Sequence, residues 1–118
     1  MSDSPSFQPT IDVRSPRPNV ALVVLGGEHD LFSADLLQQT FNDSLAGSGH
    51  VIVDLSGAQF IDSTIIGVLV QTMNRAADRD RRFTVVLGTA PVVERILDVT
   101  GVLELLDVVP TVESALAA

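Results

Sequence analysis

The chain has 118 residues, of which 46 % are hydrophobic and 19 % are charged, a size and balance that suit one globular domain and exclude a largely disordered chain. It contains seven arginines and fifteen acidic residues, and the resulting formal net charge of −8 repels nucleic-acid phosphates and anionic lipid headgroups. The absence of cysteine excludes disulfides, thiolate nucleophiles and Cys-based zinc sites, and two histidines are too few for a His cluster.

Nothing in the chain indicates a membrane or a secretion route. No apolar run approaches the ~18 residues of a membrane span, and the N-terminus lacks the basic and apolar regions of a signal peptide. We therefore expect a cytoplasmic protein with no membrane partner. Residues 1–9 are rich in Ser and Pro and are predicted to form a flexible tail before a single domain over 10–118.

Short apolar runs separated by turn-forming residues predict strands in the first half of the chain. Prolines separate the first two strands, and Gly26-Gly27 is expected to end the second. Apolar residues then recur every four positions, which predicts a helix capped by Ser33 and ended by Gly47. A β-branched run that ends at Ser56-Gly57 predicts another strand. The predicted strands cover 10–13, 20–25 and 50–55, and the predicted helix covers 34–46.

The second half of the chain continues the alternation of helix and strand. Apolar residues at i, i+3, i+4 and i+7 spacing predict one helix. Pro91 can start a second helix that Gly101 ends, and Thr111 can cap a third. Short alternating elements predict crossover connections and a sheet with parallel pairs. The predicted helices cover 64–77, 91–101 and 111–117, and the predicted strands cover 83–87 and 105–109.

Asp62 and Ser63 stand where a buried strand turns into a helix. Helix N-termini carry unsatisfied backbone N–H groups and a partial positive charge, so they suit anions and charge-changing chemistry. From spacing alone, however, the simplest interpretation is that one of the two residues caps the helix. Asp30 likewise could cap or solvate the loop after its strand.

A nucleophilic hydrolase is the enzyme class for which the sequence offers candidate residues. It would need a serine, a base and an orienting acid, for which Ser63, His29 and Asp30 can be nominated. The nucleophile elbow requires Gly-x-Ser-x-Gly, whereas Ser63 lies between Ile61 and Ile65. We therefore predict no catalytic residues.

The remaining candidate motifs also have structural interpretations. The glycine pairs match neither a P-loop nor a dinucleotide fingerprint, and no lysine is present to reach a phosphate. His29 is predicted on a loop, and His50 at the start of a strand, in a structural or exposed role. We expect no cofactor and no metal site.

Three motifs in order resemble the STAS family, specifically its stand-alone bacterial anti-sigma factor antagonists. Residues 54–67 read Asp-Leu-Ser-Gly-Ala-Gln-Phe-Ile-Asp-Ser-Thr-Ile-Ile-Gly and resemble the family's D-S-[ST]-G-x-G run after a buried strand. Residues 25–30 are similar to its L-x-G-E-L-D segment, and residues 91–102 to its P-x-V-x-R-x-[LF]-x-x-[ST]-G-L segment. The resemblance implies an α/β fold, a single STAS domain with a mixed four- to five-stranded sheet packed with about four helices.

The resemblance also implies a function. Such a protein captures an anti-sigma factor, often itself a serine kinase, and so frees a sigma factor. The family's phosphoacceptor serine maps to Ser63; the kinase supplies the ATP, phosphorylation weakens the complex, and a metal-dependent serine phosphatase restores it. The family's loop acid maps to Asp30. The expected partner-binding residues are Asp30, Asp62, Ser63 and Thr64, on a monomer or weak dimer.

One position departs from the family pattern. Ile65 stands where the family has Gly, directly after Ser63 and Thr64. A β-branched side chain restricts the backbone and close approach, which counts against a kinase grasping this loop. Thr64 is then a second candidate acceptor. The alternatives are a constitutively active or differently regulated antagonist, a STAS scaffold subunit in a larger signalling assembly, and a small-molecule-sensing STAS module.

Overall fold

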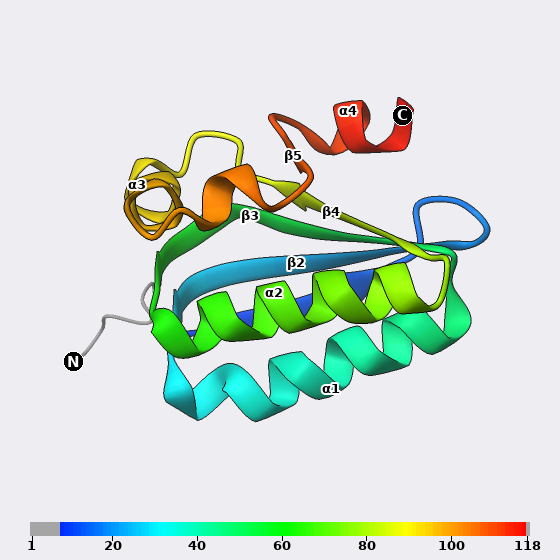
Figure 1. Ribbon diagram of the computed structural model, residues 1–118, viewed down its shortest axis with the longest axis horizontal. Helices are drawn as coiled ribbons and strands as arrows, with labels where there is room; N and C mark the ends of the chain where they lie inside the picture. The colour runs from blue at the N-terminus through cyan, green and yellow to red at the C-terminus, as the bar shows by residue number, and fades with distance from the viewer. Residues whose placement is uncertain (1–7, 118) are drawn as a thin grey trace.

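The computed structural model describes residues 8–117 of the chain (Figure 1). The predicted tail at 1–9 therefore lies almost entirely outside the described residues. In chain order the elements are β1 (Thr10–Arg14), β2 (Val20–His29), α1 (Leu31–Gly47), β3 (His50–Ile61), α2 (Ser63–Asp78), β4 (Arg82–Val86), α3 (Pro91–Val99), the 3-10 helix η2 (Val102–Glu104), β5 (Val108–Val109) and α4 (Val112–Ala117).

The strands form one five-stranded sheet in the order β1-β2-β3-β4-β5. β1 is antiparallel to β2, and the other neighbours are parallel. Helices α1 and α2 lie side by side on one face, and α4 lies on the opposite face (Figure 1). The predicted α/β fold, with a mixed four- to five-stranded sheet and about four helices, is thus confirmed over residues 8–117.

The core follows the period-2 alternation of the strands. Residues of one parity face α1 and α2, as Val23 and Val53 do, and both are completely buried. Residues of the other parity, such as Leu22 and Ile52, pack under α4 instead. Because both faces are covered, the strands read as nearly continuous apolar runs.

Two strands continue past the glycines that were predicted to end them. β2 extends to His29 and β3 to Ile61, with irregular pairing between Val24 and Glu28 of β2. At Gly26 an added Cβ would lie 2.6 Å from Oγ1 of Thr10, and Gly27 has a positive φ of 77°. These glycines are therefore paired residues within β2, next to two bulges whose extra residues lie in β3, rather than strand ends.

Two other predictions needed correction near chain reversals. The predicted strand 105–109 is a strand only at Val108–Val109, because the N–H groups of Leu105 and Leu106 both donate to the Val102 carbonyl in a tight turn. The predicted cap Ser33 lies inside α1, which begins at Leu31. The predicted cap Thr111 is confirmed, since its Oγ1 accepts the Ser114 N–H at 3.0 Å.

Candidate functional site at the joined N-termini of α1 and α2

Both long helices begin at the same edge of the sheet. β2 and β3 are parallel neighbours, His29 and Ile61 are paired, and each is followed by an aspartate and then a helix. The Asp62 N–H donates to the His29 carbonyl at 3.2 Å, which extends the pairing to the start of α2. The N-termini of α1 and α2 consequently lie together, at the left end of the view in Figure 1.

The Asp62 carboxylate bonds both helices. Its Oδ1 accepts the Ile65 N–H at 3.1 Å, which makes Asp62 the N-cap of α2. Its Oδ2 accepts the N–H of Leu31, which is the first residue of α1, also at 3.1 Å. Asp30 caps α1 through Oδ1, which accepts the Phe32 N–H at 2.9 Å. Two half-buried carboxylates therefore satisfy the positive ends of two adjoining helices.

Ser63 and Thr64 are the first two residues of α2, and both are exposed. The sequence left open whether Asp62 or Ser63 caps the helix, and the structure assigns this role to Asp62. Within residues 8–117 neither hydroxyl makes a hydrogen bond that the fold requires. Ser63 is thus an accessible hydroxyl beside a helix N-terminus and a carboxylate.

Ile65 does not cover this surface. Its side chain is completely buried in the main core, and only its backbone N–H takes part in the cap of α2. The expectation that the side chain limits close approach to Ser63 is therefore wrong. What remains is its effect on the backbone, because a buried β-branched residue fixes the first turn of α2 more firmly than Gly would.

His29 is completely buried at the end of β2, so its predicted position on a loop is wrong. Its Nε2 lies 3.0 Å from the Gly26 carbonyl and 3.2 Å from the Thr10 carbonyl, and its Nδ1 lies 3.0 Å from the Ser33 hydroxyl. Because carbonyls only accept, Nε2 carries the proton. Burial lowers the pKa of His29, against the two carbonyls and the Asp30 charge, which raise it.

This environment rules out the nominated Ser63-His29-Asp30 arrangement. Both ring nitrogens of His29 are bonded to other groups, and the Asp30 carboxylate is a helix cap. The signal for a buried His29 was nevertheless present in the sequence, since the residue stands where the family's L-x-G-E-L-D segment has Leu. A polar residue at a core position requires partners, and here three elements supply them.

Exposed apolar side chains stand close to the two caps in the chain, a feature that sequence reasoning missed. On α1, Phe32 is 91 % exposed, and Leu31 and Leu36 are 63 % and 62 % exposed. Phe60 near the end of β3 is 40 % exposed. Large apolar side chains exposed to water near a functional motif are typical of a protein interaction surface. Its signal in the sequence was the Leu31-Phe32 pair, which follows Asp30 at the start of α1.

His50 starts β3 as predicted and has a structural contact. Its Nε2 lies 2.8 Å from Oγ1 of the buried Thr84, whose hydroxyl also lies 3.2 Å from Asp107. Burial, followed by the charge of Arg82, lowers the pKa of His50. Within residues 8–117, no group of three or more His, Asp and Glu side chains is arranged to hold a metal ion. None of the helices described is long and apolar enough to cross a membrane.

The comparison with known proteins agrees with this architecture. The STAS domain family model matches residues 13–115, and the chain belongs to this family. An anti-sigma-B factor antagonist of Staphylococcus epidermidis is 29 % identical over 87 residues, covering 73 % of this chain and 80 % of the relative.

Solved structures show the same fold. The crystal structure of an anti-sigma factor antagonist from Mycobacterium paratuberculosis superposes with a TM-score of 0.84 at 26 % identity, covering 98 % of this chain and 97 % of the other. The anti-sigma factor antagonist SpoIIAA in its unphosphorylated form gives a TM-score of 0.76 at 16 % identity, covering 91 % and 93 %. The likeness to SpoIIAA concerns the fold alone.

Proposed function

We propose that this protein is a cytoplasmic anti-sigma factor antagonist without catalytic activity, which binds an anti-sigma factor and so frees a sigma factor. The names of the relatives support this assignment. The observation that carries it is Ser63, an exposed hydroxyl that the fold does not use, set beside two joined helix caps and a group of exposed apolar side chains.

The contact surface we propose combines charge with apolar area. Asp30 and Asp62 are half-buried and bring negative charge to the centre, and Ser63 and Thr64 lie beside them. Phe32 projects from the first turn of α1 and is the natural anchor for an apolar pocket. The complementary surface on the anti-sigma factor would be basic, with a pocket that accepts an aromatic ring.

Phosphorylation of Ser63 by a kinase partner is the proposed switch. A phosphoserine carries about −1.5 to −2 charges. The helix N-terminus accepts an anion, but the neighbouring Asp62 repels it, and a partner surface would have to desolvate the added charge. A hundredfold loss of affinity requires only ~2.8 kcal/mol. A serine phosphatase would reverse the change, and Thr64 is the secondary acceptor.

The burial of Ile65 removes one objection to this switch. A kinase approaching Ser63 meets Thr64 and the exposed side of α2, whereas the Ile65 side chain points into the core. The departure from the family Gly therefore leaves the hydroxyl accessible. We propose that Ser63 is phosphorylated despite this substitution.

The test compares Ser63→Glu with Ser63→Ala in calorimetric titration against the cognate anti-sigma factor. We expect Ser63→Ala to bind like the unmodified protein and Ser63→Glu to bind at least tenfold more weakly. Gln71→Glu, on the exposed side of α2 farther along the helix, is the charge control. Equal affinities for the Glu and Ala variants would reject the switch.

Phosphorylation needs its own measurement. Incubation with the partner kinase and ATP, followed by intact mass, should add one phosphate. The addition should vanish in Ser63→Ala and persist in Thr64→Ala. A protein that binds its partner but gains no mass would be a constitutive antagonist, which separates the binding proposal from the phosphorylation proposal.

A further inference from the structure

β1 is an edge strand with one free side. It pairs with β2, and no other strand among residues 8–117 pairs with its second side. Such an edge presents unpaired N–H and C=O groups that can pair with another chain. Short length and charge normally blunt an edge, so the side chains of β1 decide what it can accept.

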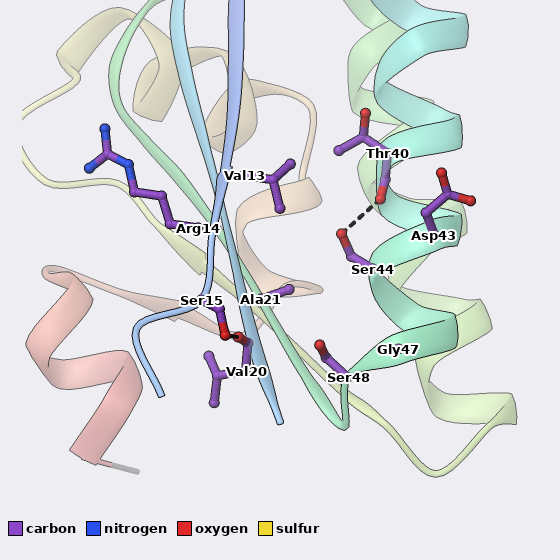
Figure 2. Close-up of a pocket in the computed structure, with 10 residues that line it drawn as sticks. All are labelled: Val13, Arg14, Ser15, Val20, Ala21, Thr40, Asp43, Ser44, Gly47 and Ser48. Carbon is purple, nitrogen blue, oxygen red and sulfur yellow. Dashed lines mark hydrogen bonds between the residues drawn. The ribbon is translucent and has the colours of Figure 1, made fainter. Parts of the chain in front are cut away.

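The side chains of β1 alternate between the two faces of the sheet. Val13 points toward α1 and is 53 % exposed, although it pairs with the buried Val23 of β2. Arg14 points the other way, as Figure 2 shows. Asp12 has the same parity as Arg14, and its Oδ2 accepts the Arg14 Nε–H at 2.8 Å. The edge thus carries an apolar residue on one face and an opposite-charge pair on the other.

A groove of about 460 Å³ lies between β1 and the C-terminal half of α1, next to Val13. Small side chains line it, because Ala21, Thr40 and Ser44 leave room that larger residues would fill (Figure 2). The Thr40 and Ser44 hydroxyls donate to the carbonyls of Leu36 and Thr40 of their own helix. The groove therefore suits an apolar side chain better than a polar ligand.

We propose that β1 pairs with β1 of a second copy of this chain, antiparallel and around a two-fold axis at Val13. In this register Asp12 lies opposite Arg14 of the second copy, and Arg14 lies opposite its Asp12. The two Val13 side chains meet on the α1 face, at the mouths of the two grooves. The exposed Asp12–Arg14 pair within each chain becomes two pairs between chains.

The charges select this register over the neighbouring one. In a two-fold antiparallel pair, residues directly opposite each other point to the same face of the sheet. Moving the axis from Val13 to another residue therefore changes which side chains lie opposite each other. Centring it on Asp12 would place the two Asp12 carboxylates opposite each other. Like charges directly opposite are destabilising, whereas opposite charges stabilise. The sequence of β1 is thus complementary to itself in one register.

This surface is distinct from the joined helix caps. Thr40 and Ser44 lie in the C-terminal half of α1, whereas Asp30 and Ser63 lie at the helix N-termini. A dimer formed through β1 would leave the Ser63 site open on each copy. The proposal therefore does not depend on the proposed function.

The experiment uses the full chain and two charge variants, Asp12→Arg and Arg14→Asp. Each single variant places like charges opposite each other twice in a two-fold dimer. We expect sedimentation equilibrium to show a concentration-dependent dimer for the unmodified chain. Dimerisation by either variant alone should be at least about tenfold weaker. Thermal unfolding of each variant verifies that it is folded.

The decisive sample is an equimolar mixture of the two variants. An Asp12→Arg chain facing an Arg14→Asp chain restores two opposite-charge pairs, so the mixture should dimerise as the unmodified chain does. The double variant Asp12→Arg/Arg14→Asp should also regain self-association. A chain that stays monomeric from micromolar to low millimolar concentration would overturn the proposal. So would a dimer that the single variants do not weaken, or a mixture that shows no rescue.

Discussion

The Asp62 carboxylate makes hydrogen bonds in two different helices, so its removal should cost more than the loss of one cap. Losing an N-cap side chain costs typically ~1 kcal/mol. The bond to Leu31 N–H adds about 1 kcal/mol, the usual net value of a hydrogen bond at a site that water reaches. We therefore expect Asp62→Ala to lower the free energy of unfolding by about 2 kcal/mol.

Urea denaturation followed by circular dichroism measures this change as a shift in midpoint at constant slope. Asp30→Ala is the matched control, since Asp30 caps α1 through one bond and should cost about 1 kcal/mol. Ser63→Ala should change stability by less than about 0.5 kcal/mol, because it removes only an exposed hydroxyl that makes no hydrogen bond within the fold. The expected order of destabilisation is Asp62, then Asp30, then Ser63.

A double-mutant cycle with Leu31→Pro isolates the bond between the helices. Leu31 is the first residue of α1, where proline is tolerated, and Asp30 before it already has the extended backbone that a following proline favours. Leu31→Pro removes the N–H donor, so Asp62→Ala should cost about 1 kcal/mol less in that background. A coupling energy indistinguishable from zero would refute the reasoning that Asp62 stabilises both helices.

Three further outcomes are expected. Burial lowers the pKa of His29 and of His50 below 6.5, so the unfolded chain takes up protons first as pH falls, and stability should decrease below about pH 6.5. In denaturation series from pH 7.5 to 5, His29→Leu should reduce the slope of stability against pH. An unchanged slope would contradict the lowered pKa of His29. Ile65→Gly, which restores the family residue, should destabilise by about 3–5 kcal/mol in urea denaturation because it empties a buried site in a helix; a loss below about 1 kcal/mol would contradict its core role. Phe32→Ala should weaken anti-sigma factor binding at least about tenfold with unchanged stability, whereas Val99→Ala, an exposed apolar control on α3, should leave affinity unchanged.

The sequence predicted the fold well because its signals are local or periodic. Apolar spacing located α2 to within one residue at each end, and Thr111 was identified as a cap by its residue type. The glycines were misread for the opposite reason. Whether Gly26 ends a strand or stays paired beside a bulge depends on its neighbour strand β3, and this pairing is not encoded in the local pattern.

The candidate site was located from the sequence, but its internal connections were not. Residue type made Asp62 and Ser63 equally good caps, and only the backbone geometry decides between them. The bond from Asp62 to Leu31 joins residues 31 positions apart, so no spacing rule predicts it. The burial of His29 likewise depends on a distant residue, since the carbonyl of Thr10 in β1 lies 3.2 Å from its Nε2.

Because Asp62 caps the helices and Ser63 does not, the proposed switch can act without disturbing the fold. A regulatory hydroxyl must change its charge without unfolding the domain that carries it. Here Asp62 meets the capping needs of both helices, so Ser63 can be modified or replaced at little cost to the fold. Substitutions at Ser63 therefore report on partner binding alone, whereas a loss of binding in Asp62→Ala would mix a lost contact with a displaced α1. Measuring both variants against the same partner separates the residue that signals from the residue that holds the site together.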